Sequence, residues 1–155
     1  MSKDLIIQNM AVATDDYNQL IDNISSLWVT AKEKAINAVN TELLEANWQT
    51  GKYIVEFEQG GKVRAEYGKQ LLVNLAKDLT LKNGRGFSRS NLLYMRKFYL
   101  SFPKSETVSH ILTWSHYFEI LKCDDPWEMQ FYMKQGINEG WKVRELKRQM
   151  KSCLF

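Results

Sequence analysis

The segment that decides the fold reads Gly84-Arg85-Gly86-Phe87-Ser88-Arg89-Ser90-Asn91-Leu92-Leu93-Tyr94-Met95-Arg96-Lys97-Phe98-Tyr99. Its two glycines favour a turn, because glycine tolerates positive φ. Ser88 can then cap the start of a helix, and Pro103 prevents the helix from continuing past its end. These signals predict a helix from about Arg89 to Leu100.

The predicted helix has two different faces. At 100° per residue, one face gathers the apolar side chains of Leu92, Met95, Phe98, Tyr99 and Phe102. The other gathers Arg89, Ser90, Arg96 and Lys97. No Asp or Glu occurs from Leu79 to Ser105, whereas a solvated face usually mixes both signs of charge. The pattern therefore favours contact with phosphates, although an ordinary solvent-exposed helix face is the alternative.

Length and composition indicate one all-α domain over residues 1–155. The 155 residues suffice for one core, and 45% hydrophobic with 25% charged residues is typical of a globular protein. Only two prolines and eight glycines interrupt long helical periods. The charge is uneven, because residues 1–60 hold four Lys or Arg and nine Asp or Glu, whereas residues 61–155 hold seventeen and nine. The basic excess belongs to the second part.

The two cysteines and two histidines lack the spacing of a disulfide framework or a metal site, and no apolar run is long enough for a membrane span. We therefore expect a cytoplasmic protein with reduced thiols, no membrane association, no metal and no cofactor.

The N-terminal part predicts a long helical segment. Residues 1–13 lack periodicity and are expected to be a flexible lead-in, while residues 14–60 keep apolar side chains at helical spacing from Tyr17 to Phe57. A helix of roughly forty residues would be about 60 Å long, and its apolar stripe would then pair two chains into a homodimer. Alternatively, a bend near residues 37–41 would fold the segment back into a self-covering antiparallel pair.

Residues 61–155 are expected to form the helical core. A helix from about Ala65 to Lys82, the glycine turn and the basic helix follow one another in the order of a helix-turn-helix unit. Ser115 is expected to cap a short helix, and Asp125 with Pro126 to begin another that Gly136 and Gly140 loosen. The last helix carries Arg144, Lys147 and Arg148 and offers a second basic face, again with a solvated helix as the alternative.

These residues resemble the N-terminal domain of the YhcG family. The resemblance rests on the segment from Gly84 to Pro103, on Trp114-Ser115-His116-Tyr117, on Trp141 with Arg144-Glu145-Leu146, and upstream on Val39-Asn40, Trp48 and Gly51. It covers roughly residues 17 to 155. It implies a helix-turn-helix or winged-helix-like DNA-binding module from bacterial, restriction-associated genes. In full-length members a PD-(D/E)XK nuclease domain follows this module.

The chain departs from the family pattern in several places. It ends about where the first domain of the family ends, so the resemblance implies that the nuclease domain is missing. Glu145-Leu146-Lys147 spells an E-x-K, but it falls in a helical period rather than on the scaffold that a metal-dependent nuclease needs. We therefore expect no catalytic residues. Asn47, Met129 or Gln130, and Lys142 stand where the family usually has tyrosine, arginine and serine.

The sequence thus predicts a non-enzymatic DNA-binding module. The expected contacts with DNA are Lys82, Arg85, Arg89, Ser90, Asn91, Arg96 and Lys97, extended by Arg144, Lys147 and Arg148. The alternative is a protein-interaction or oligomerisation adaptor for a separate nuclease or restriction subunit. Leu93 and Leu100 favour that alternative, because they fall on the basic face.

Overall fold

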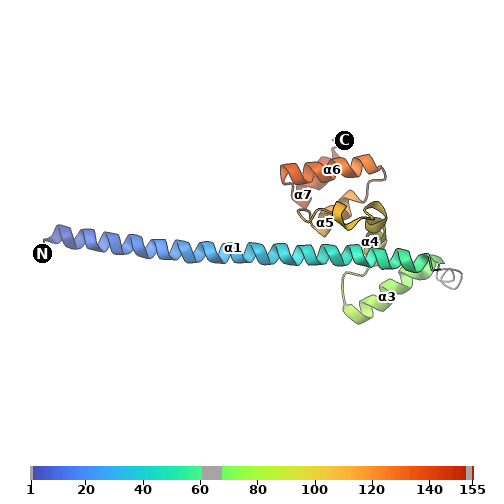
Figure 1. The fold of residues 1–155 in the computed structure, drawn as a ribbon, viewed down its shortest axis with the longest axis horizontal. Coiled ribbons are helices and arrows are strands. Elements are labelled where there is room, and N and C mark those ends of the chain that lie inside the picture. Colours follow the sequence, from blue (N-terminus) through green and yellow to red (C-terminus); the bar gives the residue numbers. More distant parts are fainter. Residues whose placement is uncertain (1, 61–67, 153–154) are drawn as a thin grey trace. The chain divides into compact units, whose positions relative to one another are not determined.

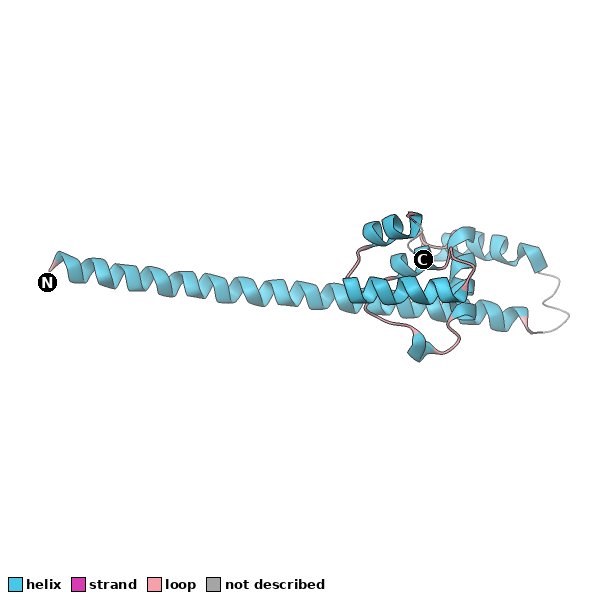
Figure 2. Cartoon of the chain, turned by 90° about the horizontal axis from the view of Figure 1, so that it is seen from above, coloured by secondary structure: helices cyan, strands magenta, loops and turns pink. Residues whose placement is uncertain are grey.

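The computed structural model describes residues 2–60, 68–152 and 155, and this part of the chain confirms the all-α class (Figure 1). Its α-helices are α1 (Lys3–Glu58), α3 (Leu71–Asn83), α4 (Arg89–Ser101), α5 (Trp114–Ile120), α6 (Pro126–Glu139) and α7 (Val143–Lys151). Short 3-10 helices at Gly68–Gln70 and Ser105–Thr107 precede α3 and α5. Figure 2 draws no strand in these described residues.

Helix α1 begins earlier than predicted and is continuous from Lys3 to Glu58. The helix start predicted near Thr14 is wrong, because α1 begins at Lys3 and includes most of the segment 1–13. The expected flexibility of that segment stays a prediction. The hydroxyl of Ser2 accepts a hydrogen bond from the amide of Leu5, which is how a serine caps a first helical turn. The helix also continues through residues 37–41, so the self-covering antiparallel pair is wrong and the single long helix is correct.

The chain divides into two units, residues 1–39 and residues 40–155. The first unit consists of the N-terminal part of α1. Every residue from Ser2 to Val39 is exposed. The boundary at Asn40 falls inside α1, not at residue 61 where the sequence suggested a change from long helix to helical core.

The second unit holds the hydrophobic core. Its larger cluster joins the last part of α1 to α4, α5, α6 and α7, and it centres on the fully buried side chains of Leu44, Phe98, Tyr117, Tyr132 and Leu146. A smaller cluster, made of Ile54, Leu71, Leu92 and Met95, holds α3 against α1 and α4. Trp48 anchors α1 to the end of α4, because its buried indole N–H donates to the carbonyl of Phe102 over 2.7 Å.

Helix α1 approaches the backbone of α4 very closely at Gly51. A Cβ atom placed on Gly51 would lie 2.0 Å from the carbonyl oxygen of Met95 and 2.8 Å from its carbonyl carbon. Both atoms belong to the backbone and cannot rotate away. The close approach therefore requires glycine at position 51, although glycine lowers helix stability by about 1 kcal/mol relative to alanine.

Most helix ends in this unit follow the expected signals. Ser88 caps α4 by accepting from the amide of Asn91, and Asp125 caps α6 ahead of Pro126. Helix α6 continues through Gly136 and ends at Gly140, whose φ of 64° is left-handed. The start predicted for the helix before the glycine turn, at residue 65, lies outside the described residues.

The predicted cap of α5 is wrong, because Thr113 rather than Ser115 precedes the helix. The Nδ1 atom of His116 accepts from the amide of Thr113 in a capping box. The Nε2 atom of His116 lies 2.8 Å from the carbonyl of Trp141, which ties α5 to the start of α7. His116 is thus structural, as expected.

A substitution at the close approach should destabilise the second unit. We expect Gly51→Ala to lower the free energy of unfolding by about 1–3 kcal/mol, because the added methyl group forces α1 and α4 apart. The measurement is urea unfolding followed by tryptophan fluorescence. Gly136→Ala is the matched control, since its added Cβ would meet only Leu112 Cδ2 at 3.5 Å, an ordinary contact. This control should be neutral or stabilising by up to about 1 kcal/mol. Equal losses in both variants would contradict the prediction.

Candidate nucleic-acid interface

The turn between α3 and α4 is built by two glycines and one asparagine. Gly84 and Gly86 have φ of 87° and 104°, which only glycine adopts without strain. The side-chain amide of Asn91 then donates to the carbonyl of Gly86 over 2.5 Å. Its oxygen accepts from the indole N–H of Trp114 over 3.1 Å. Asn91 therefore joins the turn, the start of α4 and α5.

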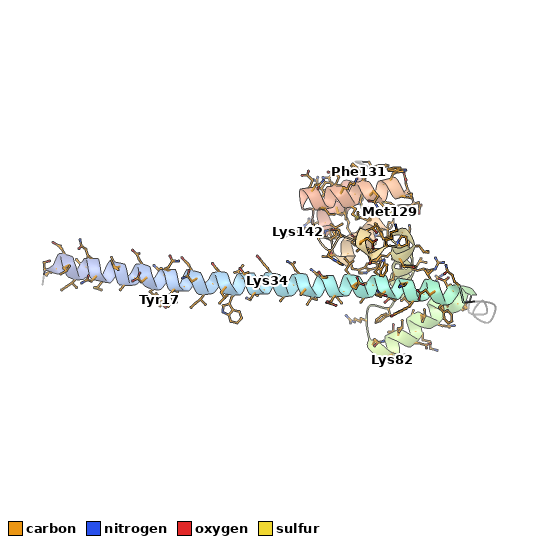
Figure 3. The ribbon with its side chains drawn as sticks, viewed as in Figure 1. Tyr17, Lys34, Lys82, Met129, Phe131 and Lys142 are labelled. Atoms are coloured by element: carbon orange, nitrogen blue, oxygen red, sulfur yellow. The ribbon has the colours of Figure 1, made fainter. Side chains whose placement is uncertain are left out.

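Four of the predicted site residues lie exposed around this turn. Lys82 is in the last turn of α3, Arg85 is between the two glycines, and Arg89 and Ser90 begin α4. No ion pair or hydrogen bond of their side chains occurs within the described residues. Figure 3 shows Lys82 at the end of α3. We call Lys82, Arg85 and Arg89 the turn cations.

The position of Arg89 is electrostatically unfavourable without an anion. The first turn of α4 contains no acidic residue, and the free N–H groups of a helix N-terminus already carry partial positive charge. Lys82 lies instead in the last turn of α3, where the helix dipole favours a cation. A phosphate group would be attracted to such a site by the helix and by the three side chains together.

A groove of about 400 Å³ lies beside the turn. It is lined by Asn40, Asn47, Thr50, Arg85, Phe87, Asn91 and Trp114 among others. The amides of Asn40 and Asn47 were not predicted as site residues, because they are far from the turn in sequence. Asn47 donates to the carbonyl of Leu43, one turn earlier in α1. The lining also includes Leu43, Ala46 and Met95, so the groove places a mainly apolar surface with a few amide groups next to Arg85.

The predicted residues farther along α4 have partners inside the chain. Arg96 forms an ion pair through its Nε atom with Glu58 at the end of α1. The Nζ atom of Lys97 donates to the carbonyl of Cys123 over 3.1 Å and lies 3.5 Å from Asp124. Both side chains are about two-thirds buried. Their charges are partly neutralised, so they are weaker candidates for phosphate contacts than the turn cations.

Helix α7 forms a second basic surface. A concave region of about 620 Å³ is lined by Trp141, Lys142, Arg144, Glu145, Lys147, Arg148 and Lys151, with Gly140. Lys147 lies 3.6 Å from the buried carboxylate of Glu119, and Arg148 pairs with Glu145 at 2.6 Å. Arg144 is exposed and has no partner among the described residues. No hydrogen bond or ion pair of the described chain joins this surface to the turn cations.

Comparison with known proteins identifies the family. The model of the DUF1016 N-terminal domain matches residues 23–155. The chain belongs to this family. It is also 36% identical over 174 residues to a protein of Escherichia coli (strain K12) named "Putative nuclease YhcG". That alignment covers 92% of this chain but 46% of the relative, so the chain spans about half the length of the curated protein that it matches. No solved structure matches this chain.

Within this DUF1016 N-terminal domain, the side chain of Glu145 in the E-x-K sequence is hydrogen-bonded to neighbouring residues of α7. Hydrogen bonds from Arg148 and Gln149 hold the pKa of its carboxyl at about 2, well below its usual value. Lys147 pairs with Glu119 instead of facing Glu145. Among the described residues, no group of three or more His, Cys, Asp or Glu side chains is placed to hold a metal ion.

The one described cysteine is also poorly suited to act as a nucleophile. Cys123 is a buried free thiol, and burial, followed by the nearby carboxylate of Glu128, raises its pKa to about 11. A reactive cysteine needs a thiolate near neutral pH. Cys153 lies outside the described residues. The described helices include none long and apolar enough to cross a bilayer.

The hydrogen bonds of Asn91 predict a structural effect of its substitution. Asn91→Leu keeps a similar volume but leaves the Gly86 carbonyl and the Trp114 N–H without this partner. We expect the free energy of unfolding to fall by about 1–3 kcal/mol. The adjacent Ser90→Ala is the control, because the Ser90 hydroxyl is exposed and has no partner among the described residues, and it should change stability by less than about 0.5 kcal/mol. Urea unfolding measures the stability of both variants. An Asn91→Leu variant with an unchanged free energy of unfolding would contradict the structural role of the Asn91 hydrogen bonds.

Proposed function

We propose that this domain is a non-catalytic DNA-binding module of the helix-turn-helix type, with α3 bracing α4 and the turn cations meeting the phosphate backbone. The observation that carries the proposal is the set of Lys82, Arg85 and Arg89, which lie from the last turn of α3 to the first turn of α4, exposed and without acidic partners among the described residues. Proteins commonly fix their position on DNA by such contacts between cations, helix N-termini and phosphates.

The arrangement of α3 and α4 supports the helix-turn-helix assignment. The smaller core cluster packs Leu71 of α3 against Leu92 and Met95 of α4, so the first helix buttresses the second. The turn keeps Arg89 and Ser90 at the exposed start of α4, which is the part of a recognition helix that approaches base edges. Asn91 holds the turn in place, because its side chain donates to the carbonyl of Gly86 and accepts from the indole N–H of Trp114.

The relative supports the same class of ligand. Its name describes a nuclease, whose substrate is a nucleic acid, and this chain matches about half of that protein. We infer that residues 23–155 contribute nucleic-acid binding rather than cleavage. Two observations support this division: Glu145 is hydrogen-bonded to Arg148 and Gln149, and no group of three or more His, Cys, Asp or Glu side chains in the described part of the chain is placed to hold a metal ion.

The surface on α7 is proposed to extend the footprint. Arg144 is the part of it best suited to a phosphate contact, because Lys147 and Arg148 already pair with carboxylates. We expect Arg96 and Lys97 to contribute little to binding for the same reason.

The proposal predicts a defined salt dependence. Four phosphate contacts, three from the turn cations and one from Arg144, give a slope of about −3.6 in log affinity against log salt, so affinity for a mixed-sequence duplex should fall about 150-fold between 50 and 200 mM salt. Arg85→Ala/Arg89→Ala should halve this slope and leave a fall of about 12-fold. Fluorescence anisotropy of a labelled duplex measures both values.

The matched control for this experiment is Lys104→Ala/Lys134→Ala. Both lysines are exposed, neither has a side-chain partner among the described residues, and the net charge changes by the same amount. This variant should keep the slope of the unaltered protein. Absence of binding at 50 mM salt, or equal losses in the two variants, would contradict the proposed role of the turn cations.

A second candidate function is an adaptor for a separate nuclease or restriction subunit. It is favoured by Leu93 and Leu100 on α4, which are each 48% exposed on the side that carries the basic residues. Exposed leucines suit a protein partner better than a phosphate backbone. If the domain is an adaptor, Leu93→Ser/Leu100→Ser should abolish capture of a purified nuclease subunit, while Arg85→Ala/Arg89→Ala should leave it intact.

A further inference from the structure

The first unit carries an apolar stripe along the N-terminal part of α1. With Ile24 at heptad position a, the a, d and e positions of the central heptads are Tyr17, Leu20, Ile21, Ile24, Leu27 and Trp28. We call these six residues the α1 stripe. They span about 120° of the helix surface, and the opposite face carries Asp15, Gln19, Asp22 and Ser26.

The α1 stripe is exposed along its whole length. Its six side chains are between 43% and 68% exposed, with Leu27 and Trp28 among the most exposed. Figure 3 shows Tyr17 extending from the helix. A contiguous apolar surface of this size is uncommon on a monomer in water and usually marks an interaction site.

The helix itself also needs a partner. Residues 2–39 include several Asn, Asp, Ser and Thr residues, which are weak helix formers, and none of these residues is buried. Isolated helices in water are marginal without tertiary packing. A partner that buries the stripe would supply the missing stabilisation.

A second copy of the chain offers a complementary surface. Tyr17 and Trp28 are 61% and 62% exposed, so each can bury a further area of about 90–150 Å², and the two rings together provide about 200–300 Å² of the roughly 800 Å² per partner in a stable interface. The four aliphatic side chains of the stripe lie between and beside them on the same face. An isologous pair of stripes therefore supplies a large part of the required area, and the neighbouring residues of the paired helices must contribute the remainder.

The distribution of charge selects the orientation of such a pair. Residues 3–22 hold one lysine and four aspartates, whereas residues 23–39 hold two lysines and one glutamate. A parallel pair in register would place each charge beside its own copy, including Lys34 against Lys34 at a d position. An antiparallel pair instead places the acidic part of each helix beside the basic part of the other.

We propose that the α1 stripe is a dimerisation surface that pairs antiparallel with the stripe of a second copy of this chain. In the register that places residue 22 of one copy opposite residue 22 of the other, every a residue faces a d residue of the partner helix. Ile24 then packs against Leu20 of the other copy, and Tyr17 packs against Leu27 of the other copy. Lys34 then lies beside Met10, with its aliphatic stem on the apolar surface and its ammonium group in water.

The mass of the full chain in solution tests the dimer. Sedimentation equilibrium from 1 to 100 μM should give a mass approaching twice the 18.2 kDa of one chain at the highest concentrations. Leu20→Glu/Leu27→Glu should be monomeric throughout this range, because it buries four carboxylates in the paired stripe. Gln19→Glu/Ser26→Glu adds the same charge to the opposite face of the helix and should remain dimeric.

Cross-linking tests the orientation. In a background with Cys123→Ala and Cys153→Ala, a mixture of Met10→Cys and Lys34→Cys chains should form a mixed disulfide dimer under mild oxidation. Neither variant should cross-link efficiently to itself, because the two copies of each position lie far apart in an antiparallel pair.

Specific results would overturn the proposal. These are a mass of one chain across the whole concentration range, a mass above two chains, equal disruption by the two glutamate variants, or efficient cross-linking of Met10→Cys chains to one another. If the chain is monomeric, the α1 stripe is not a dimerisation surface and must bind a different partner. None of these measurements uses DNA, so they stand or fall independently of the proposed DNA binding.

Discussion

The second unit depends on the close approach of α1 to α4 at Gly51. The missing side chain lets α1 approach the carbonyl of Met95, and both core clusters form around this point. On one side, Trp48 reaches the end of α4 and donates to the carbonyl of Phe102. On the other, Ile54 packs with Leu71, Leu92 and Met95. A larger residue at position 51 would separate the helices and loosen both clusters, since each includes residues from both α1 and α4.

The same packing divides the basic residues of α4 into those with a partner inside the chain and those without one among the described residues. Because α4 is held against the end of α1, Arg96 reaches Glu58 and forms an ion pair there. Lys97 reaches the carbonyl that follows α5. Arg89 lies at the other end of α4, beyond the residues that pack on α1, and has no carboxylate partner among the described residues. The exposed positive charge is therefore concentrated at the turn, which is why we centre the proposed interface there.

Helix α1 shows how one amphipathic pattern can serve two purposes. From Asn40 onward one face of the helix, which includes Leu44 and Ile54, is buried in the core of the second unit. In residues 2–39 the same spacing produces the α1 stripe, whose side chains are all exposed. The hydrophobic effect is the same for both stretches, so the exposed one gains free energy from any partner that covers it. The proposed pairing of two chains would give both halves of the helix a buried face.

The sequence by itself determined the helical class, the helical character of α1 beyond residue 14, both ends of α4 and the start of α6, because periodicity and capping are local properties of the chain. It also placed Lys82, Arg85 and Arg89 together, since they flank one short turn. It missed the cap at Ser2 and assigned the cap of α5 to Ser115. The true cap at Thr113 has its amide bonded by the imidazole of His116, and histidine is not a common partner in a capping box. The local pattern could not distinguish one continuous helix from two helices that fold back on each other near residues 37–41.

Tertiary structure alone decided which charges are available. Arg89 and Arg96 look equivalent in a helical projection, yet one has no partner within the described chain and the other is paired with Glu58, which is distant in sequence. Asn91 looked like a residue that faces DNA, and both ends of its amide are engaged by Gly86 and Trp114. Contacts between residues far apart in sequence leave no local signature, so packing had to be known before the basic face could be divided into structural and exposed residues.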